Sequence, residues 1–277
     1  MRIARHGQPG QERPIISGSD GLWRDMADIT DDVTCDFLAS DIAAIDLAQL
    51  PVVAELQRFG PPIANPGKIV CIGLNYRDHA AETGADLPKE PIVFLKTPDT
   101  VVGPDDDVLI PRGSVRTDWE VELAVVIGSE ARYLASPDEA DAFILGYTIC
   151  NDVSEREFQL ERGGQWDKGK NCETFNPMGP WLVTADEIPD PQHLGMRLWV
   201  NGKFRQNGNS ADMIFGIRYL VWYLSQFMVL RPGDVINTGT PAGVALGHPD
   251  TPYLRKGDVI ELEIDGLGRQ RQVMAEA

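Results

Sequence analysis

The sequence predicts an α+β fold that is dominated by β-strands, with a small N-terminal domain joined to a larger body. Short apolar runs separated by turn residues recur along the body, which is the pattern of strands. Helical spacing is confined to a few segments, so the pattern does not match a doubly wound βαβ array. A joint rich in proline and glycine, Pro61–Gly67, marks a boundary between residues 1–64 and residues 65–277.

Residues 1–64 are expected to contain a short strand at the start, a polar turn at Gly18–Gly21 and a helical stretch that ends near Leu56. In the first part of the body, Tyr76–Gly84 has the pattern of a short helix ended by glycine. Apolar strands are predicted around it, at 68–76, 91–98, 108–111 and 118–128.

The second half of the body contains a second and a third predicted helix. Ser136–Gly146 begins with a capping box, in which Glu139 follows Ser136 by three residues. Apolar residues recur at helical spacing from about Ala211 to Met228, ahead of Pro232. The remaining segments are predicted strands, with a hairpin around Asn201–Gly202: 147–152, 197–206, 234–239, 258–266 and 269–276.

The composition excludes two classes of partner. The chain has 277 residues, a formal charge of −17 and a pI of about 4.6, so the phosphates of nucleic acid and anionic lipids would repel it. No apolar run is long enough to span a membrane, and the first residues lack the apolar core of a signal peptide. Four widely spaced cysteines are read as reduced thiols, and a cytoplasmic location is expected.

Two glutamates one residue apart are the most informative local feature. Glu120 and Glu122 lie in an otherwise apolar strand, 118–128, and alternation places them on the same face. The residues that continue this face are apolar, so both faces look buried. Two buried carboxylates repel each other, and a divalent cation is the simplest way to hold both ionised. The alternative is the solvated face of an edge strand.

Asp152 is a candidate third carboxylate. It ends an apolar strand thirty residues after Glu122, and a returning strand could bring it beside the pair. Three oxygen ligands suit Mg²⁺, Mn²⁺ or Ca²⁺, and the absence of a cluster of histidine and cysteine makes zinc less suitable. Taken alone, Asp152 could also be an ordinary aspartate at the end of a strand.

His79 and Glu82 form a second candidate group. They are three residues apart on a predicted helix and therefore share a face. A carboxylate beside an imidazole raises its basicity and fixes its tautomer, as a general base requires. The alternative is a surface ion pair. The other histidines, His6, His193 and His248, lack such a context and are read as structural or surface residues.

Two further segments carry polar residues suited to binding an anion. Lys168 and Lys170 follow Gln159 in a polar, glycine-rich segment, and either lysine could pair with a substrate carboxylate or a developing oxyanion. Thr240 lies in a turn rich in glycine and threonine, whose N–H groups could hold a carboxylate. Each feature has a plain alternative, namely a solvated loop lysine and an ordinary turn.

Together these segments resemble the fumarylacetoacetate hydrolase family over about residues 68–268. The resemblance rests on seven ordered motifs: GLNYRDHAAE, PIVFLKTP, DWEVELAVVIG, GYTICNDVSEREFQ, WDKGKNCETFNPMGP, WVNGKFRQNGNSADMIF and LRPGDVINTGTPAGV. It implies a mixed β-sandwich roll that binds one Mg²⁺ or Mn²⁺, usually within a homodimer. Residues 1–64 resemble the variable N-terminal domain of many members.

The resemblance also implies roles for individual residues. Glu120, Glu122 and Asp152 match the metal carboxylates of the family, and His79 and Glu82 match its water-activating dyad on a mobile lid. Lys170 and Gln159 match residues that contact the substrate and its oxyanion, and Thr240 matches the turn that holds a substrate carboxylate. Lys96 also matches a family lysine. An additional aspartate ligand of the largest members has no counterpart, so the chain fits the three-carboxylate branch.

The implied activity is hydrolysis of a C–C bond in a 2,4-diketo acid, a small 2-oxo acid substrate, to give pyruvate. The overall resemblance favours a 2,4-diketo-3-deoxy sugar acid, such as one derived from L-rhamnonate or L-fuconate. Fumarylpyruvate hydrolysis or isomerisation in aromatic catabolism is one alternative, and oxaloacetate decarboxylation or tautomerisation is another. A metal-dependent protein that binds a small ligand without turning it over is the alternative outside enzymes.

Overall fold

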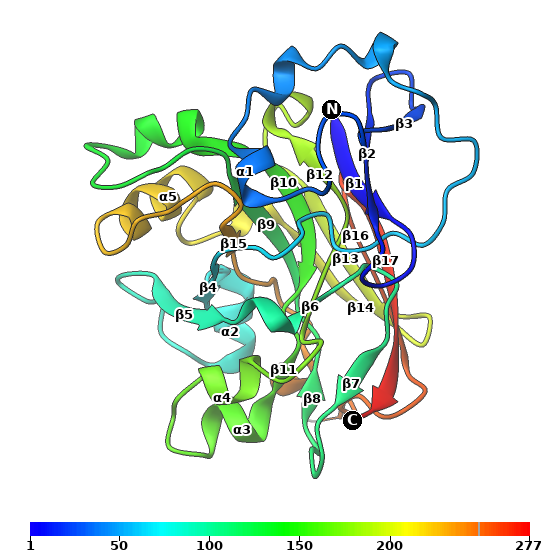
Figure 1. Ribbon diagram of the computed structural model, residues 1–277. Coiled ribbons are helices and arrows are strands. Elements are labelled where there is room, and N and C mark those ends of the chain that lie inside the picture. The colour runs from blue at the N-terminus through cyan, green and yellow to red at the C-terminus, as the bar shows by residue number, and fades with distance from the viewer. Residues whose placement is uncertain (249) are drawn as a thin grey trace.

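The computed structural model describes residues 1–248 and 250–277, and it confirms an α+β fold dominated by strands (Figure 1). A mixed ten-stranded sheet forms its centre, in the order β3-β2-β1-β12-β10-β9-β15-β4-β5, with β6 paired to β12. These strands span Arg2–His6 (β1), Arg13–Ser17 (β2), Trp23–Asp25 (β3), Ile69–Gly73 (β4), Ile92–Lys96 (β5), Val101–Val102 (β6), Val121–Ile127 (β9), Ile144–Asn151 (β10), Asn176–Thr184 (β12) and Val235–Asn237 (β15).

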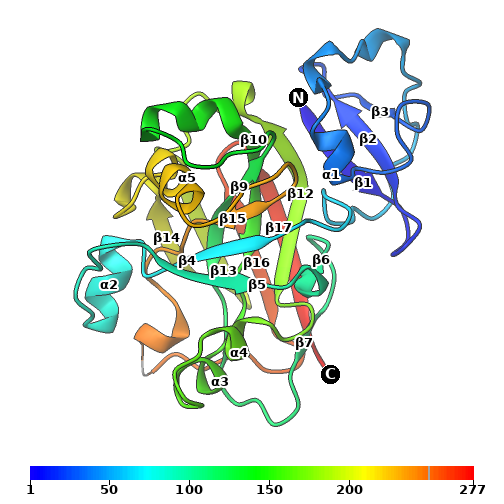
Figure 2. The same ribbon diagram turned by 60° about the vertical axis from the view of Figure 1, so that its left-hand side comes forward.

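A second sheet of five strands has the order β14-β13-β16-β17-β7 and lies against the first (Figure 2). Its strands span Val108–Ile110 (β7), Gly195–Val200 (β13), Lys203–Asn209 (β14), Val259–Ile264 (β16) and Gly268–Glu276 (β17). The predicted hairpin is present, because β13 and β14 pair through a turn in which Asn201 and Gly202 both have positive φ. A small ladder joins β8 (Thr117–Asp118) to β11 (Ser154–Glu155).

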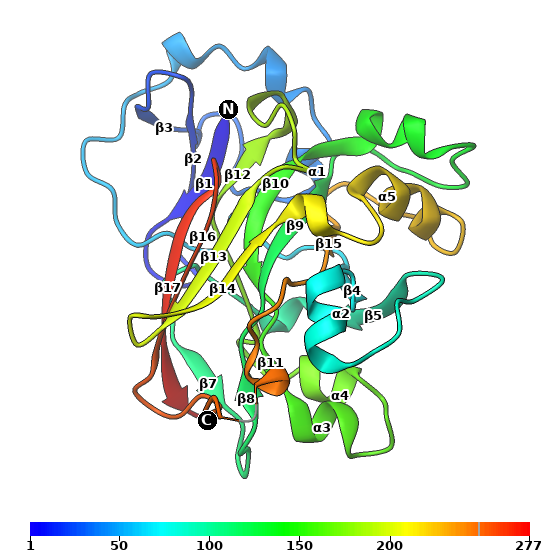
Figure 3. The ribbon, with the colours of Figure 1, turned by 180° about the vertical axis from the view of Figure 1, so that it is seen from behind.

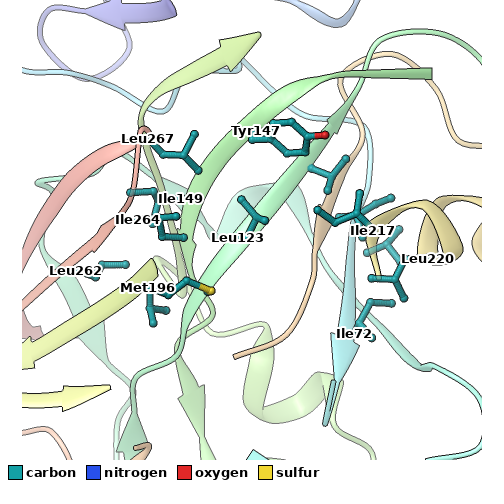
Figure 4. Close-up of a cluster of buried hydrophobic side chains, with 14 of the residues drawn as sticks. Ile72, Leu123, Tyr147, Ile149, Met196, Ile217, Leu220, Leu262, Ile264 and Leu267 are labelled. Atoms are coloured by element: carbon teal, nitrogen blue, oxygen red, sulfur yellow. The ribbon is translucent and has the colours of Figure 1, made fainter. Parts of the chain in front are cut away.

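The main core fills the space between the two sheets. Leu123 and Ile149 of the ten-stranded sheet belong to one buried cluster with Met196 and Leu262 of the five-stranded sheet (Figure 4). Leu220 of the helix α5 (Ile217–Ser225) extends this cluster along the sheet. Because β9 pairs with β10 on one side and with β15 on the other, the strand that carries Glu122 is central rather than an edge.

A second cluster covers the other face of the central sheet. Ala124 and Val126 of β9 lie in it together with residues of the N-terminal segment, such as Phe37 and Ile63. The strand β1 also pairs with β12, so residues 1–64 both extend the sheet and cover part of it. The division at residue 64 remains a prediction.

The helices are shorter than the sequence predicts in three places. Residues 1–64 contain only short turns of helix, α1 (Cys35–Leu38) and two 3-10 turns, in place of one stretch. Pro137–Phe143 is a 3-10 helix that ends where β10 begins, at Ile144, and Ser136 makes no capping bond through its side chain. The remaining α-helices are α2 (Arg77–Thr83), α3 (Arg156–Leu160) and α4 (Asp167–Lys170).

The predicted helix over 211–228 is also wrong in its first half. The structure has a 3-10 turn at Ser210–Asp212 and then α5, which begins only at Ile217. Between them, Ile214 N–H donates to the carbonyl of Asn75 at 2.7 Å, and Phe215 N–H donates to the Asn75 side chain at 2.9 Å. These tertiary hydrogen bonds replace the helical ones, which the local apolar spacing cannot reveal.

The structure also bears on the expectations about membrane-spanning segments and cysteines. None of the helices in the described part of the chain is long and apolar enough to cross a membrane. All four cysteines are free, and Cys71 and Cys150 are buried in the second cluster.

Candidate metal centre and active site

Three acidic side chains meet at the ends of two neighbouring strands. Glu122 belongs to β9, Glu120 directly precedes it, and Asp152 directly follows the antiparallel partner β10. All three are buried, and one oxygen from each lies within 4.8 Å of the others. The antiparallel pairing of β9 with β10 therefore brings Asp152 beside the two glutamates, as the sequence suggested.

Three cationic side chains surround these carboxylates. Lys170 of α4 donates from Nζ to Glu120 Oε2 at 2.6 Å and to Asp152 Oδ2 at 2.8 Å. Lys96 Nζ, on β5, lies 2.5 Å from Asp152 Oδ1 and also donates to the carbonyl of Val153 at 3.1 Å. These lysines, predicted to contact substrate, thus lie directly beside the candidate metal ligands.

Arg156 is the third cation, and the sequence reasoning missed it. Its Nε donates to Asp118 Oδ2 at 2.8 Å, and its Nη2 lies 2.8 Å from Glu120 Oε1. Arg156 and Asp118 are both buried. A signal was available, since Asp118 precedes Glu120 by two residues and continues the same alternation of acidic positions.

The surroundings shift the acidities of the two glutamates in opposite directions. Burial alone would raise the pKa of Glu120, but Lys170 and Arg156 lower it to about 2. Burial raises the pKa of Glu122 well above its ordinary value, and the carboxylates of Asp152 and Glu120 raise it further. Glu122 is thus the member of the group whose negative charge is least compensated by the chain.

The three acidic residues fit a hard divalent cation. They supply three oxygen donors from buried side chains, which is the donor chemistry that Mg²⁺, Mn²⁺ and Ca²⁺ prefer. Asp152 Oδ1 has no hydrogen-bond partner of good geometry, although Lys96 lies close to it. A cation would compensate the repulsion at Glu122, so the three carboxylates could hold one.

The predicted dyad lies on α2, close to these carboxylates. His79 Nδ1 lies 2.7 Å from Glu82 Oε1 in hydrogen-bond geometry, and the two side chains are each only 9 % exposed. Gly84, with φ of 67°, ends the helix as the sequence predicts. Because each side chain is only 9 % exposed, the alternative of a solvated surface ion pair does not describe this pair.

The remaining predicted residues are also close by. Gln159 of α3 accepts a hydrogen bond from Arg156 Nη1 at 3.1 Å. The Thr240 hydroxyl donates to the carbonyl of Val121 at 2.9 Å and accepts from Gln206 Nε2 at 2.7 Å. The nearby turn also positions a metal-site carboxylate, because Gly239 N–H donates to Glu122 Oε2 at 2.8 Å.

A cavity of about 190 Å³ joins most of these side chains. Its polar wall contains seven residues that the sequence predicted: His79, Glu120, Glu122, Asp152, Gln159, Lys170 and Thr240. Glu82 and Lys96 do not line the cavity. Glu82 contacts His79, and Lys96 contacts Asp152, which do line it. The rest of the wall is mostly apolar, and includes Ile92, Phe94, Leu160, Trp166 and Leu246.

A larger hollow of about 950 Å³ lies elsewhere, beside the start of α5. None of the sequence-predicted site residues lines it, and no buried polar atom without a partner opens on it among the described residues. The small cavity, where buried charges converge, is therefore the candidate active site.

His248 is exposed, as the sequence reading allowed, but it also has a contact that this reading missed. It was read as having no catalytic context, yet its Nε2 lies 3.0 Å from Glu82 Oε2. Gly243 N–H donates to the same oxygen at 2.9 Å. No local pattern connects His248 to Glu82, because 166 positions of the chain separate them.

Figure 3 shows α2 on the same side of the molecule as α3, α4 and the orange turn near residue 245. The central sheet has buried acidic residues at its strand ends, and an imidazole–carboxylate pair and lysines lie beside them. Together these features indicate the class of the protein. That class is an enzyme with an acidic triad that could hold a divalent cation.

Comparison with known proteins identifies the family. Residues 68–275 match the model described as fumarylacetoacetate (FAA) hydrolase C-terminal. The chain therefore belongs to the fumarylacetoacetate hydrolase family. A relative from Burkholderia multivorans (strain ATCC 17616 / 249), with the name "Putative hydrolase", is 51% identical over 99% of this chain and 98% of its own length.

Solved structures of similar proteins share the whole fold. The fumarylacetoacetate hydrolase from psychrophilic Exiguobacterium antarcticum is 33% identical, with a TM-score of 0.89 and full coverage of both chains. The 2-hydroxyhepta-2,4-diene-1,7-dioate isomerase from Mycobacterium marinum is 31% identical, with a TM-score of 0.75 over 100% of this chain and 98% of that chain. Maleylpyruvate hydrolase from Sphingobium sp. SYK-6, in complex with manganese(II) and pyruvate, is 28% identical with a TM-score of 0.82, again with full coverage of both chains.

Proposed function

We propose that this enzyme hydrolyses a C–C bond in a 2,4-diketo acid with the help of a divalent cation, giving pyruvate and a second carboxylic acid. One observation carries the proposal: the imidazole of the buried His79–Glu82 pair and the acidic triad line the same cavity. The manganese and pyruvate named for the similar maleylpyruvate hydrolase support this choice of cation class and product.

Glu120, Glu122 and Asp152 would hold the cation, with Mg²⁺ as the first candidate and Mn²⁺ as the second. When bound, such a cation supplies Lewis-acid polarisation and neutralises negative charge on the substrate. The chain contributes the positions of its ligands: Arg156 fixes one oxygen of Glu120, and Gly239 N–H fixes one oxygen of Glu122.

His79 is the proposed general base for water. With its Nδ1 proton donated to Glu82, its Nε2 atom is free to accept a proton from a water molecule in the cavity. Glu82 holds this tautomer and stabilises the imidazolium that forms. The resulting hydroxide would attack the distal ketone of the substrate, at C4, and the C3–C4 bond would then break.

Lys170 is the proposed stabiliser of the oxyanion. Asp152 and Glu120 raise the pKa of Lys170 against the opposing effect of burial, so its ammonium group stays charged in the cavity. A fixed positive charge with little access to water stabilises negative charge that develops beside it. Lys96, in contrast, reaches the cavity only through Asp152, and we assign it the support of that ligand.

Gln159 and Thr240 are the proposed binding residues for the rest of the substrate. Both line the cavity. Because the Thr240 hydroxyl already donates to Val121 and accepts from Gln206, we assign carboxylate binding to the N–H group of Thr240 rather than to its hydroxyl.

The acyl group of the substrate remains to be identified. The sequence favoured a 2,4-diketo-3-deoxy sugar acid, and this stays a prediction. The apolar part of the cavity wall, with Ile92, Phe94 and Trp166, offers few partners for a chain of hydroxyl groups. This observation favours a second candidate, an acylpyruvate with a short apolar acyl group.

The test is pyruvate release from a panel of 2,4-dioxo acids, each with Mg²⁺ and with EDTA. The panel contains a 2,4-diketo-3-deoxy sugar acid, acetylpyruvate, fumarylpyruvate and oxaloacetate. Metal-dependent pyruvate formation from a diketo acid is the expected result, and the relative rates identify the acyl group. Release of CO₂ from oxaloacetate alone would move the protein to the decarboxylases and would overturn the roles of His79 and Glu82.

The same assay distinguishes an enzyme from a protein that only binds its ligand. The ligand-binding alternative predicts that pyruvate is never released, although the diketo acid binds in the presence of Mg²⁺.

The homodimer and the cytoplasmic location also remain predictions, and sedimentation of the purified chain would test the former.

A further inference from the structure

The loop 243–248 holds the outer side of the Glu82 carboxylate. Gly243 N–H donates to Glu82 Oε2 at 2.9 Å, and His248 Nε2 lies 3.0 Å from the same atom. Gly247 packs so closely that a Cβ placed there would lie 2.7 Å from the Glu82 carboxylate carbon. Since His79 contacts the other oxygen, Oε1, one carboxylate joins two imidazoles.

The two imidazoles differ in their access to water. The side chains of His79 and Glu82 are each 9 % exposed, whereas that of His248 is 54 % exposed. His248 is therefore the member of the group that meets bulk solvent, and Glu82 lies between it and the cavity.

The position of this loop is fixed from inside the protein. Ala245 N–H and Leu246 N–H donate to the two oxygens of Asp118, at 2.8 Å and 3.0 Å. Asp118 is buried and is paired with Arg156, which also contacts Glu120. The buried ion pair therefore connects the acidic triad to the loop that carries His248. Arg205, which donates to Thr251 at 3.4 Å, is a further charged side chain near this loop.

The chemistry of hydrolysis leaves one proton to be removed. Water supplies a hydroxyl group to the acyl carbon and one hydrogen to C3 of the released pyruvate. The new carboxylic acid has an ordinary pKa of about 4 and ionises at neutral pH, so each turnover releases one proton overall. His79 takes its proton inside a small cavity, and a chain of polar groups connects it through Glu82 to the exposed side chain of His248.

We propose that His248 is a positioning residue for the Glu82–His79 pair and that it carries the released proton from Glu82 to solvent. This inference rests on the proposed hydrolytic function. In the positioning role, His248 and Gly243 fix Glu82 Oε2, so that Glu82 Oε1 stays directed at His79. In the transfer role, His79 Nδ1 passes its proton to Glu82 Oε1, and the carboxyl group turns so that this proton faces His248 Nε2. His248, neutral with its own proton on Nδ1, accepts it at Nε2 and then loses a proton to water, so each turnover delivers one proton to solvent.

The test compares His248→Ala with His193→Ala in the full-length, Mg²⁺-loaded enzyme. His193 is the matched control, because it is also an exposed histidine beside a carboxylate, with Nδ1 2.6 Å from Asp190. Loss of a partly exposed contact to a charged group should lower kcat of His248→Ala about three- to tenfold, with little change in KM. Added imidazole should restore kcat of this variant, and His248→Gln, which keeps a hydrogen-bond donor, should retain more kcat than His248→Ala.

A second readout does not depend on turnover. The chain has four histidines, so their ring protons can be followed individually by NMR as the pH is varied. The Nδ1 proton signal of His79 should shift in His248→Ala, because Glu82 has lost its second imidazole partner, and it should not shift in His193→Ala. Identical behaviour of the two variants in both readouts would overturn the inference. Absence of pyruvate release by the wild-type enzyme would instead overturn the proposed function.

Discussion

Two histidine–carboxylate pairs in this protein have almost the same local geometry and very different surroundings. In both, the partners are three residues apart in the chain, and the N–O distances are 2.7 Å for His79–Glu82 and 2.6 Å for Asp190–His193. The side chains of the first pair are 9 % exposed, and those of the second are 68 % and 57 % exposed. The comparison shows that the same sequence spacing creates both pairs, and that only the first is shielded from water beside other charges.

The strongest test of this contrast is substitution of each histidine. His79→Gln should lower kcat/KM for the diketo acid by about 10² to 10⁴, because the proposed general base is lost. His193→Gln should leave it within about twofold, because exposed pairs contribute little. Steady-state pyruvate release gives both values, and titration calorimetry with Mg²⁺ should show that His79→Gln still binds the metal. Equal effects of the two substitutions would remove the distinction.

Buried and exposed arginine–carboxylate pairs should likewise differ in how much they contribute to the free energy of unfolding. Arg156→Met leaves Asp118 buried without its cationic partner, while Glu120 keeps only Lys170, and this should lower the free energy of unfolding by about 3–5 kcal/mol. Arg218→Met removes an exposed pair with Asp141 and should change it by about 0.5 kcal/mol or less. Urea unfolding, followed by circular dichroism, measures both, and a small effect of Arg156→Met would contradict the proposed link between triad and loop.

The carboxylates of the two pairs provide a third comparison. Glu82→Gln keeps the size of the side chain but no longer stabilises the His79 imidazolium, so kcat should fall by about 10². Asp190→Asn, the equivalent change in the exposed pair, should leave kcat unchanged. A normal rate for Glu82→Gln would show that His79 works without its partner.

The smallest expected effect concerns the stability of the metal-free protein. Burial and the carboxylates of Asp152 and Glu120 raise the pKa of Glu122 in the folded state, from an ordinary value of 4.5. A carboxyl with a raised folded-state pKa stabilises the fold below its unfolded pKa, and this contribution is lost as pH rises through the folded value.

Glu122→Gln should therefore raise Tm in EDTA at neutral pH by about 2–4 °C, which corresponds to roughly 1 kcal/mol in a protein of this size. The gain should shrink as pH falls toward 4.5. In the variant, Mg²⁺ should no longer raise Tm, whereas Asp190→Asn should respond to Mg²⁺ like the wild type. A lower Tm for Glu122→Gln in EDTA would show that the carboxylate is already compensated by the chain.

The sequence was sufficient for those features that depend on local periodicity. The shared face of Glu120 and Glu122, the helix ended by Gly84 and the turn at Asn201–Gly202 follow from alternation and backbone preference, and the structure contains all three. The sequence also suggested that Asp152 could meet these carboxylates but left an ordinary strand-end aspartate as an alternative, and the structure brings the three together.

The features that the sequence could not reveal depend on contacts between distant segments. The first half of the helix predicted over 211–228 is replaced by hydrogen bonds to Asn75, far away in the chain. His248 reaches Glu82 only because Asp118 holds the backbone at Ala245 and Leu246. Arg156 could have been suspected, since four acidic residues, Asp118, Glu120, Glu122 and Asp152, need buried partners, but no local pattern selects it among the arginines.

The close packing of positive charges around the acidic triad has a consequence for how this protein is made. Lys96, Arg156 and Lys170 contact three of the four buried carboxylates, Asp118, Glu120 and Asp152. The fourth, Glu122, has a raised pKa and stays neutral more readily. The newly synthesised chain therefore carries its own counter-charges and can complete folding before an ion arrives. Loading of the proposed cation would then be a separate, reversible event on a finished protein.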